Sequence, residues 1–247
     1  MRVLKIGGNE LSDASFLAGL AQAVAQMVQH EPVVIVHGGG RAIADLSTKL
    51  GIASRKVAGL RVTGSALLDV VEMVLSGKSN KLLVRALLAQ GVEALGISGV
   101  DAHLLQAERQ QHPTTNLGYV GKIVAVNSDV IKRLSGQGFT VVVSPVSADA
   151  TGQPYNINAD DAGTAIAAAL QADNFDFISN VPGVLKDGYL IPTLSIKEAE
   201  QLIDAKIITD GMIPKVRAAL TAVERGVKQT RIVNLAGLMR GGGTVFA

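Results

Sequence analysis

Two clusters of glycine follow two short apolar segments near the start of this sequence. Gly7 and Gly8 come directly after residues 2–6, and a glycine triplet at 38–40 comes after residues 32–37. A glycine turn that leads from a strand into a helix exposes backbone N–H groups, which bind phosphate or carboxylate. Alternatively, the glycines only permit tight turns. Because there are two such clusters, we favour anion binding, although neither matches the P-loop or the dinucleotide fingerprint.

Two lysines are candidates for contact with a bound anion. Lys5 lies inside the apolar segment 2–6, where an ammonium is costly unless it reaches a partner or the open end of the strand. We interpret it as a phosphate-facing lysine, with a solvent-reaching lysine as the alternative. Lys215 lies in the first turn of a helix whose start Pro214 marks. A cation there opposes the helix dipole by roughly 0.3–1 kcal/mol, a conflict that an anion would remove. A solvated surface lysine explains Lys215 equally well.

Four other polar residues have both a structural and a functional interpretation. Asp160 stands at the start of an alanine-rich helix, where capping is its ordinary role, and Asn156 and Asn158 precede it. The two asparagines either hold a polar ligand or build a turn, and their spacing does not separate these alternatives. The guanidinium of Arg61 suits a carboxylate, but a surface arginine is equally compatible with the pattern. We interpret His37 as a hydrogen-bonded structural histidine, not a base.

Apolar segments with strand character alternate with helical patterns along the chain. This alternation predicts an α/β fold, a three-layer αβα sandwich with a mainly parallel open sheet. Two lobes are expected to share this sheet, 1–172 and 173–247. Because open sheets bind ligands at the carboxyl ends of their strands, the glycine clusters should lie at one edge. Residues 114–126 are less regular and are compatible with a hairpin. The expected strands are 2–6, 32–36, 92–97, 140–143, 175–178 and 231–233, and the expected helices are 16–29, 41–50, 67–75, 78–90, 160–171 and 213–225.

Composition excludes several classes of protein. A hydrophobic content of 48% with 18% charged residues argues against disorder, and a net charge of +2 does not predict nucleic acid or an anionic membrane as partner. The absence of cysteine excludes disulfides and thiolate metal sites. The four histidines lie far apart, so no residue is assigned to a metal site. Since no signal peptide or spanning segment is visible, we expect a soluble, cytoplasmic protein.

Five motifs together resemble the acetylglutamate kinases of the amino acid kinase family. They are KIGG (5–8), VHGGG (36–40), GLRVT (59–63), NINAD (156–160) and ITDGMIPKV (208–216), and they occur in the family's order over almost the whole chain. VHGGG with NINAD and DGMIPKV is a specific combination, whereas no single motif would be. The resemblance implies the family's fold and ATP-dependent phosphorylation of the side-chain carboxylate of N-acetyl-L-glutamate in arginine biosynthesis. Such phosphoryl transfer needs positioning and charge stabilisation but no general base, since a carboxylate is already ionised.

The resemblance also assigns roles to residues that match the family's motifs. Lys5 and Lys215 match the lysines that stabilise the transferring phosphoryl group, and Asp160 matches the carboxylate that positions them. The substrate would be held in the N-terminal lobe, and ATP with Mg²⁺ in the C-terminal lobe. The residues implied for the substrate are Gly39, Gly40, Arg61, Asn156 and Asn158. Those implied for the nucleotide are Gly8, Asn180, Val181, Pro182, Gly183, Val184, Leu185, Ile207, Ile208 and Thr209.

The sequence departs from the family pattern at Asn180, where many members carry Asp. The segment 180–183 also resembles related kinases that act on a carrier-protein-linked aminoadipate or glutamate. Those relatives carry a basic insertion near 106–115, but this segment has one Arg and one Glu here, so the free acid is the expected substrate. A non-catalytic ligand-binding member of the fold is a further alternative. Because Val3 already begins the first strand, without the extra helix of arginine-inhibited members, we expect a homodimer without arginine feedback.

Overall fold

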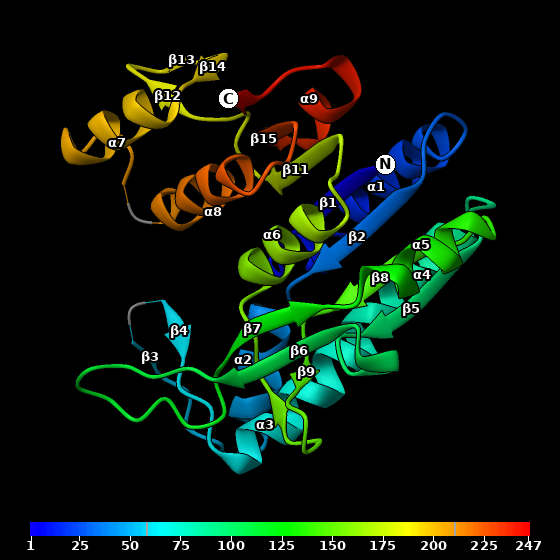
Figure 1. The fold of residues 1–247 in the computed structure, drawn as a ribbon, viewed down its shortest axis with the longest axis vertical. Coiled ribbons are helices and arrows are strands. Elements are labelled where there is room, and N and C mark those ends of the chain that lie inside the picture. The colour runs from blue at the N-terminus through cyan, green and yellow to red at the C-terminus, as the bar shows by residue number, and fades with distance from the viewer. Residues whose placement is uncertain (58, 210) are drawn as a thin grey trace.

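A computed structural model describes residues 1–57, 59–209 and 211–247 of the chain. An eight-stranded sheet forms its centre, with the strand order β14-β16-β15-β11-β1-β2-β8-β5 (Figure 1). Within the described residues β15 and β16 are antiparallel and the other neighbours in this sheet are parallel, as predicted. The strands are β1 (Arg2–Ile6), β2 (Val33–His37), β5 (Ala94–Ser98), β8 (Thr140–Ser144), β11 (Asn174–Ser179), β14 (Thr193–Leu194), β15 (Gln229–Asn234) and β16 (Thr244–Phe246).

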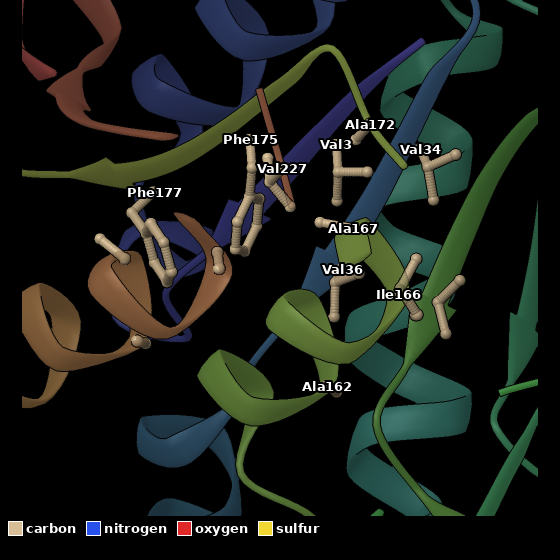
Figure 2. Close-up of a cluster of buried hydrophobic side chains, with 14 of the residues drawn as sticks. Val3, Val34, Val36, Ala162, Ile166, Ala167, Ala172, Phe175, Phe177 and Val227 are labelled. Atoms are coloured by element: carbon tan, nitrogen blue, oxygen red, sulfur yellow. The ribbon is translucent and has the colours of Figure 1, made fainter. Parts of the chain in front are cut away.

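Helices cover both faces of the sheet, which confirms the three-layer αβα architecture. One face carries Val3, Val36 and Phe175, which pack with Ile166 of α6 and with residues of α8 (Figure 2). The opposite face carries Leu4 and its neighbours, which pack against α1 and α4. The helices are α1 (Ala14–Met27), α2 (Gly40–Lys49), α3 (Ser65–Glu72), α4 (Asn80–Leu88), α5 (Ser128–Gly136), α6 (Ala159–Ala169), α7 (Ile196–Asp204), α8 (Met212–Glu224) and α9 (Leu235–Arg240), with 3₁₀ turns at Glu10–Ser12 and Asp101–His103.

A π-helical turn, η2 (Met73–Ser79), joins α3 directly to α4. The sequence predicted helical structure over 67–75 and 78–90. The structure confirms both segments and joins them, since the chain continues helically from residue 65 to residue 88 through this wider turn. π turns are rare and occur frequently at functional sites.

Shorter strands form hairpins outside the central sheet. The expected hairpin within 114–126 is only half correct, since β7 (Gly121–Val126) pairs with β6 (Leu105–Arg109), which begins earlier in the chain. Strand β6 was missed because its exposed residues are polar and its buried face is limited to Leu105 and Ala107. The other short strands are β3 (Lys56–Val57), β4 (Leu60–Arg61), β9 (Ser147–Ala148), β10 (Pro154–Tyr155), β12 (Leu185–Lys186) and β13 (Tyr189–Leu190).

The central sheet crosses the expected lobe boundary at residue 172 without a break. Strands from residues 2–144 form one half, and strands from residues 174–246 form the other, joined where β1 pairs with β11. The division into lobes therefore stays a prediction. Within the described residues, no helix combines the length and apolar character needed to cross a bilayer. Asp210, which belongs to the motif at 208–216, lies outside the described residues.

Candidate active site

A cavity of about 510 Å³ opens at the carboxyl ends of β1 and β2. Segments that lie far apart in the sequence meet there, as expected at this edge of a parallel sheet. Its polar and glycine lining residues are Lys5, Gly7, Gly8, Asn9, Glu10, Gly38, Gly39, Gly40, Lys56, Gly59, Arg61, Asn156, Asn158, Asp160, Gly211 and Lys215.

The two glycine turns touch each other in this cavity. A Cβ atom on Gly8 would lie 2.4 Å from the amide nitrogen of Gly39 and 2.5 Å from that of Gly40. Any side chain at residue 8 would therefore occupy the space in front of these amides. For the amides of Gly8, Gly39 and Gly40, the described residues offer no hydrogen-bond partner. Free amides grouped in this way are suitable donors to an anion.

Lys5 is directed toward α6 by the alternation of side chains along β1. It shares a face of the sheet with Val3, and the ammonium lies 2.7 Å from Oδ1 of Asp160 in the first turn of α6. Only 5% of Lys5 is exposed, so the ammonium needs this partner. The contact is an ion pair without the alignment of a hydrogen bond, since the buried Oδ1 accepts none.

Lys215 reaches the same cavity from the first turn of α8. The helix begins at Met212 with Gly211 as its N-cap, one residue before the start of the expected helix 213–225. Proline is tolerated there because first-turn N–H groups have no partner within the helix. The ammonium of Lys215 donates to the carbonyl of Gly211 over a long 3.4 Å. The structure thus brings Lys5 and Lys215 together in one cavity from opposite ends of the chain.

Arg61, Asn156 and Asn158 line the same cavity. The guanidinium of Arg61 donates to the carbonyl of Gly40 at 2.9 Å and to Ser54 Oγ, and partial burial lowers its pKa. Asn156 donates from Nδ2 to Thr63 Oγ1 at 3.0 Å. Asn158 caps α6 by accepting the amide of Asp160 at 2.8 Å, so its side-chain oxygen is already engaged.

The segments predicted to line the nucleotide site lie outside this cavity. Val184 and Ile208 are each 2% exposed and pack in the core, and the Val184 amide donates to Thr244 Oγ1 at 2.8 Å. Leu185 lies in the exposed hairpin β12–β13. The assignment of a nucleotide to these segments stays a prediction, and it covers Asn180, Val181, Pro182, Gly183, Val184, Leu185, Ile207, Ile208 and Thr209.

Sequence reasoning missed several residues of the cavity. Lys56 pairs directly with Arg61 across the hairpin β3–β4, so two cations face each other there. The sequence signal that could have identified Lys56 is the presence of a cation on each side of Gly59, Lys56 before it and Arg61 after it. The carboxylate of Glu10 covers Gly7, since a Cβ there would lie 2.2 Å from Oε2. The apolar lining was also missed, and consists of Ile43, Leu60, Leu75, Val120, Pro145, Ile157, Ala159 and Pro214.

His37 is a fully buried histidine at the end of β2, next to the glycine triplet. Burial lowers its pKa from 6.5 to about 4, and the nearby Lys81 ammonium acts in the same direction. The imidazole is therefore neutral at physiological pH. Nδ1 lies 3.0 Å from the carbonyl oxygen of Gly38. These contacts confirm the prediction of a hydrogen-bonded structural histidine.

Comparison with known proteins gives consistent results over almost the whole chain. The model of the amino acid kinase family matches residues 1–234. The acetylglutamate kinase of Roseiflexus castenholzii is 48% identical over 246 residues, which cover 99% of this chain and 93% of that protein. The acetylglutamate kinase of Geobacillus kaustophilus is 46% identical over 232 residues, which cover 94% and 89%.

Solved structures share the fold. A Streptococcus mutans UA159 protein has a TM-score of 0.84 and 31% identity, with 100% of this chain and 98% of that chain covered. An N-acetylglutamate synthase from Neisseria gonorrhoeae, complexed with coenzyme A and N-acetyl-glutamate, has a TM-score of 0.88 and 24% identity. The match covers 100% of this chain and 59% of the synthase chain. At this identity it shows that the two proteins share a fold and nothing further. The family match, supported by relatives of nearly equal length, shows that this chain belongs to the amino acid kinase family.

Proposed function

We propose that this chain transfers the γ-phosphoryl group of ATP to the side-chain carboxylate of N-acetyl-L-glutamate, a step of arginine biosynthesis. The observation that carries the proposal is the single cavity in which Lys5, Lys215 and three unpaired glycine amides converge. The names of the relatives, identical at up to 48%, support the choice of acid.

The chemistry needs no general base. A carboxylate oxygen of the substrate attacks the γ-phosphorus, a new P–O bond forms, and the bond from the γ-phosphorus to the bridging oxygen breaks as ADP leaves. The two ammonium groups and the glycine amides stabilise the negative charge on the transferring group. Asp160 holds the Lys5 ammonium in place. His37, buried and neutral, takes no part in proton transfer.

The substrate lies between the glycine turns and the hairpin β3–β4 in this proposal. Arg61 pairs with its non-reacting carboxylate, Asn156 binds its polar groups, and Gly39 and Gly40 donate to the reacting end, beside Asn158. All five line the cavity and belong to the proposed lobe 1–172. ATP binds to the lobe 173–247, where Lys215 lies.

Mg²⁺ enters with the nucleotide in this proposal. Among the described residues there is no group of three or more histidine, aspartate or glutamate side chains placed to hold a metal. Mg²⁺ typically binds through phosphate oxygens, water and one or two carboxylates, and the cavity has Asp160 and Glu10. These residues fit an ion that the phosphates carry. The ion would neutralise charge on the phosphates.

Trapping the acyl phosphate with hydroxylamine tests this function. Purified protein, ATP and Mg²⁺ are incubated with N-acetyl-L-glutamate, N-acetyl-L-aspartate, N-acetyl-L-2-aminoadipate or L-glutamate, and the hydroxamate is measured. The expected result is the highest kcat/KM with N-acetyl-L-glutamate. Absence of hydroxamate with every free acid would contradict it and favour a carrier-linked substrate or a binding module. The finer expectations of a homodimer and a cytoplasmic location also stay proposals, and sedimentation equilibrium tests the former.

A further inference from the structure

Two neighbouring groups determine which ring nitrogen of His37 carries its hydrogen. Nδ1 lies 3.0 Å from the Gly38 carbonyl oxygen, which can only accept, so the hydrogen is on Nδ1. Nε2 of the neutral ring is then an acceptor. Asn80 supplies the donor, since its Nδ2 lies 3.3 Å from Nε2. The two contacts therefore select the same tautomer.

The orientation of the Asn80 side chain is fixed independently of His37. Its Nδ2 also lies 3.0 Å from the carbonyl of Val142 and 3.3 Å from that of Ile97, and both carbonyls can only accept, so the two amide hydrogens are shared among these carbonyls and Nε2 of His37. Its Oδ1 accepts from the Lys81 ammonium at 3.1 Å. Asn80 is fully buried at the point where the π turn η2 ends and α4 begins. The amide thus faces His37 as a donor and not as an acceptor.

The hydrogen bond from His37 constrains the peptide between Gly38 and Gly39. No cis peptide is found in the described chain, and in a trans peptide the C=O and the N–H point in opposite directions. With the Gly38 carbonyl turned toward the imidazole, the Gly39 N–H is directed away from it. The Gly39 nitrogen lies close to Gly8 at the cavity.

We propose that His37 and Asn80 are positioning residues that aim the Gly39 N–H at the carboxylate of the substrate. Asn80 holds the imidazole as its Nδ1–H tautomer, and the imidazole holds the Gly38–Gly39 peptide. Neither side chain is among those that line the cavity, so both act through the backbone. This inference rests on the proposed function for the identity of the acid.

Substitution of His37 tests the link between its hydrogen bond and recognition of the acid. Leucine removes the donor at similar size, whereas asparagine retains an N–H near the position of Nδ1. For His37→Leu we expect a KM for N-acetyl-L-glutamate raised tenfold or more, as for loss of about 1.4 kcal/mol, with the KM for ATP within twofold. His37→Asn should recover to within about threefold of wild type. Ser76→Ala is the control. Ser76 lies in the π turn η2 that precedes Asn80, and its substitution breaks only the 2.9 Å contact to Ser144 at the end of β8. It should leave both KM values unchanged.

The outcomes separate positioning from a merely structural role. Equal losses in His37→Leu and His37→Asn, or a lower kcat with both KM values unchanged, would overturn the inference. Titration calorimetry with N-acetyl-L-glutamate provides the same comparison of variants without turnover. If the acid binds with the expected pattern but no hydroxamate forms, the proposed reaction fails while the positioning inference stands.

A spectroscopic measurement tests the tautomer directly. In ¹⁵N-labelled wild-type protein at pH 7.5, long-range ¹H–¹⁵N correlation should show His37 with a protonated Nδ1 and an unprotonated Nε2. Asn80→Asp replaces the donor with a carboxylate, so the hydrogen should move to Nε2 or the ring should become doubly protonated. A wild-type ring protonated on Nε2, or no change in Asn80→Asp, would contradict the inference.

Discussion

The ammonium of Lys5 lies 2.7 Å from the carboxylate of Asp160, which joins the middle of the central sheet to the start of α6. The pair is largely enclosed, with 7% and 16% of the two side chains exposed. The pair places a positive charge beside the free glycine amides of the cavity. In the proposed reaction Lys5 acts together with Lys215, which lies in the first turn of α8.

Removal of either lysine should slow the chemical step. For Lys5→Ala or Lys215→Ala we expect kcat to fall by roughly a hundredfold or more, because donors to the transition state are lost. Steady-state kinetics with N-acetyl-L-glutamate and ATP measures this, and circular dichroism checks the fold. Lys186→Ala, in the exposed hairpin β12–β13, is the control and should behave as wild type. Unchanged kcat in both lysine variants would refute their assigned roles.

Arg61→Ala should act mainly on binding of the acid. In the proposed function the guanidinium pairs with the non-reacting carboxylate of the acid, so we expect a KM for N-acetyl-L-glutamate raised tenfold or more with kcat changed much less. This increase in KM corresponds to the loss of one hydrogen bond to a charged group, which contributes about 1.5–3 kcal/mol. Arg55→Ala is the matched control, since Arg55 precedes the same hairpin but does not line the cavity. A large fall in kcat with an unchanged KM would show that Arg61 acts on the reaction itself.

Gly8→Ala should abolish most of the activity although it adds one methyl group. The new Cβ would lie 2.4 Å from the Gly39 nitrogen, so the glycine turns must separate, at a cost of roughly 1–3 kcal/mol in stability. Gly136→Ala is the control, because a Cβ at that site in α5 meets no heavy atom within 4 Å. Activity assays and urea unfolding of both variants compare the effects. Similar kinetics in the two variants would contradict the described contact of the turns.

His37 should make the stability of the protein depend on pH below neutrality. Its pKa is depressed to about 4 by burial, so between pH 6.5 and 4 the unfolded chain binds a proton that the folded chain does not. The free energy of unfolding is therefore undiminished above pH 6.5, and it decreases as the pH falls from 6.5 toward 4. Between pH 7.5 and pH 5 the wild type should lose about 2 kcal/mol relative to His37→Asn. Urea unfolding at both pH values measures this difference. The other histidines and Lys81 are common to both proteins, so a constant difference would contradict the prediction.

Much of the site followed from patterns that the backbone imposes. Alternation along β1 places Lys5 on the same face as Val3, and the glycine clusters mark the ends of parallel strands. The motif resemblance then identified Asp160, Arg61 and Lys215, which the structure places around one cavity. Spacing alone left each of these residues with a structural alternative, because it does not report which distant segments meet.

Other features depend on tertiary contacts that one sequence does not display. Asn80 has the pattern of an ordinary helical position, and only the π turn brings its amide to carbonyls of β5 and β8. Helices α5 and α7 were missed because each is only nine residues long and mostly polar, so the apolar pattern of a helix is weak in both. Strands β14 and β16 were missed because they are two and three residues long. Lys56 is exposed and becomes notable only opposite Arg61.

The central claim is that Lys5 and Lys215 act on one phosphoryl group in one cavity. A crystal structure with ADP, Mg²⁺, N-acetyl-L-glutamate and aluminium fluoride, a mimic of the transferring group, tests it most directly. We predict the fluoride between the nucleotide and the side-chain carboxylate, with both lysine Nζ atoms and the Gly8 amide within hydrogen-bond distance. A fluoride bound elsewhere, or one that only a single lysine reaches, would contradict the account.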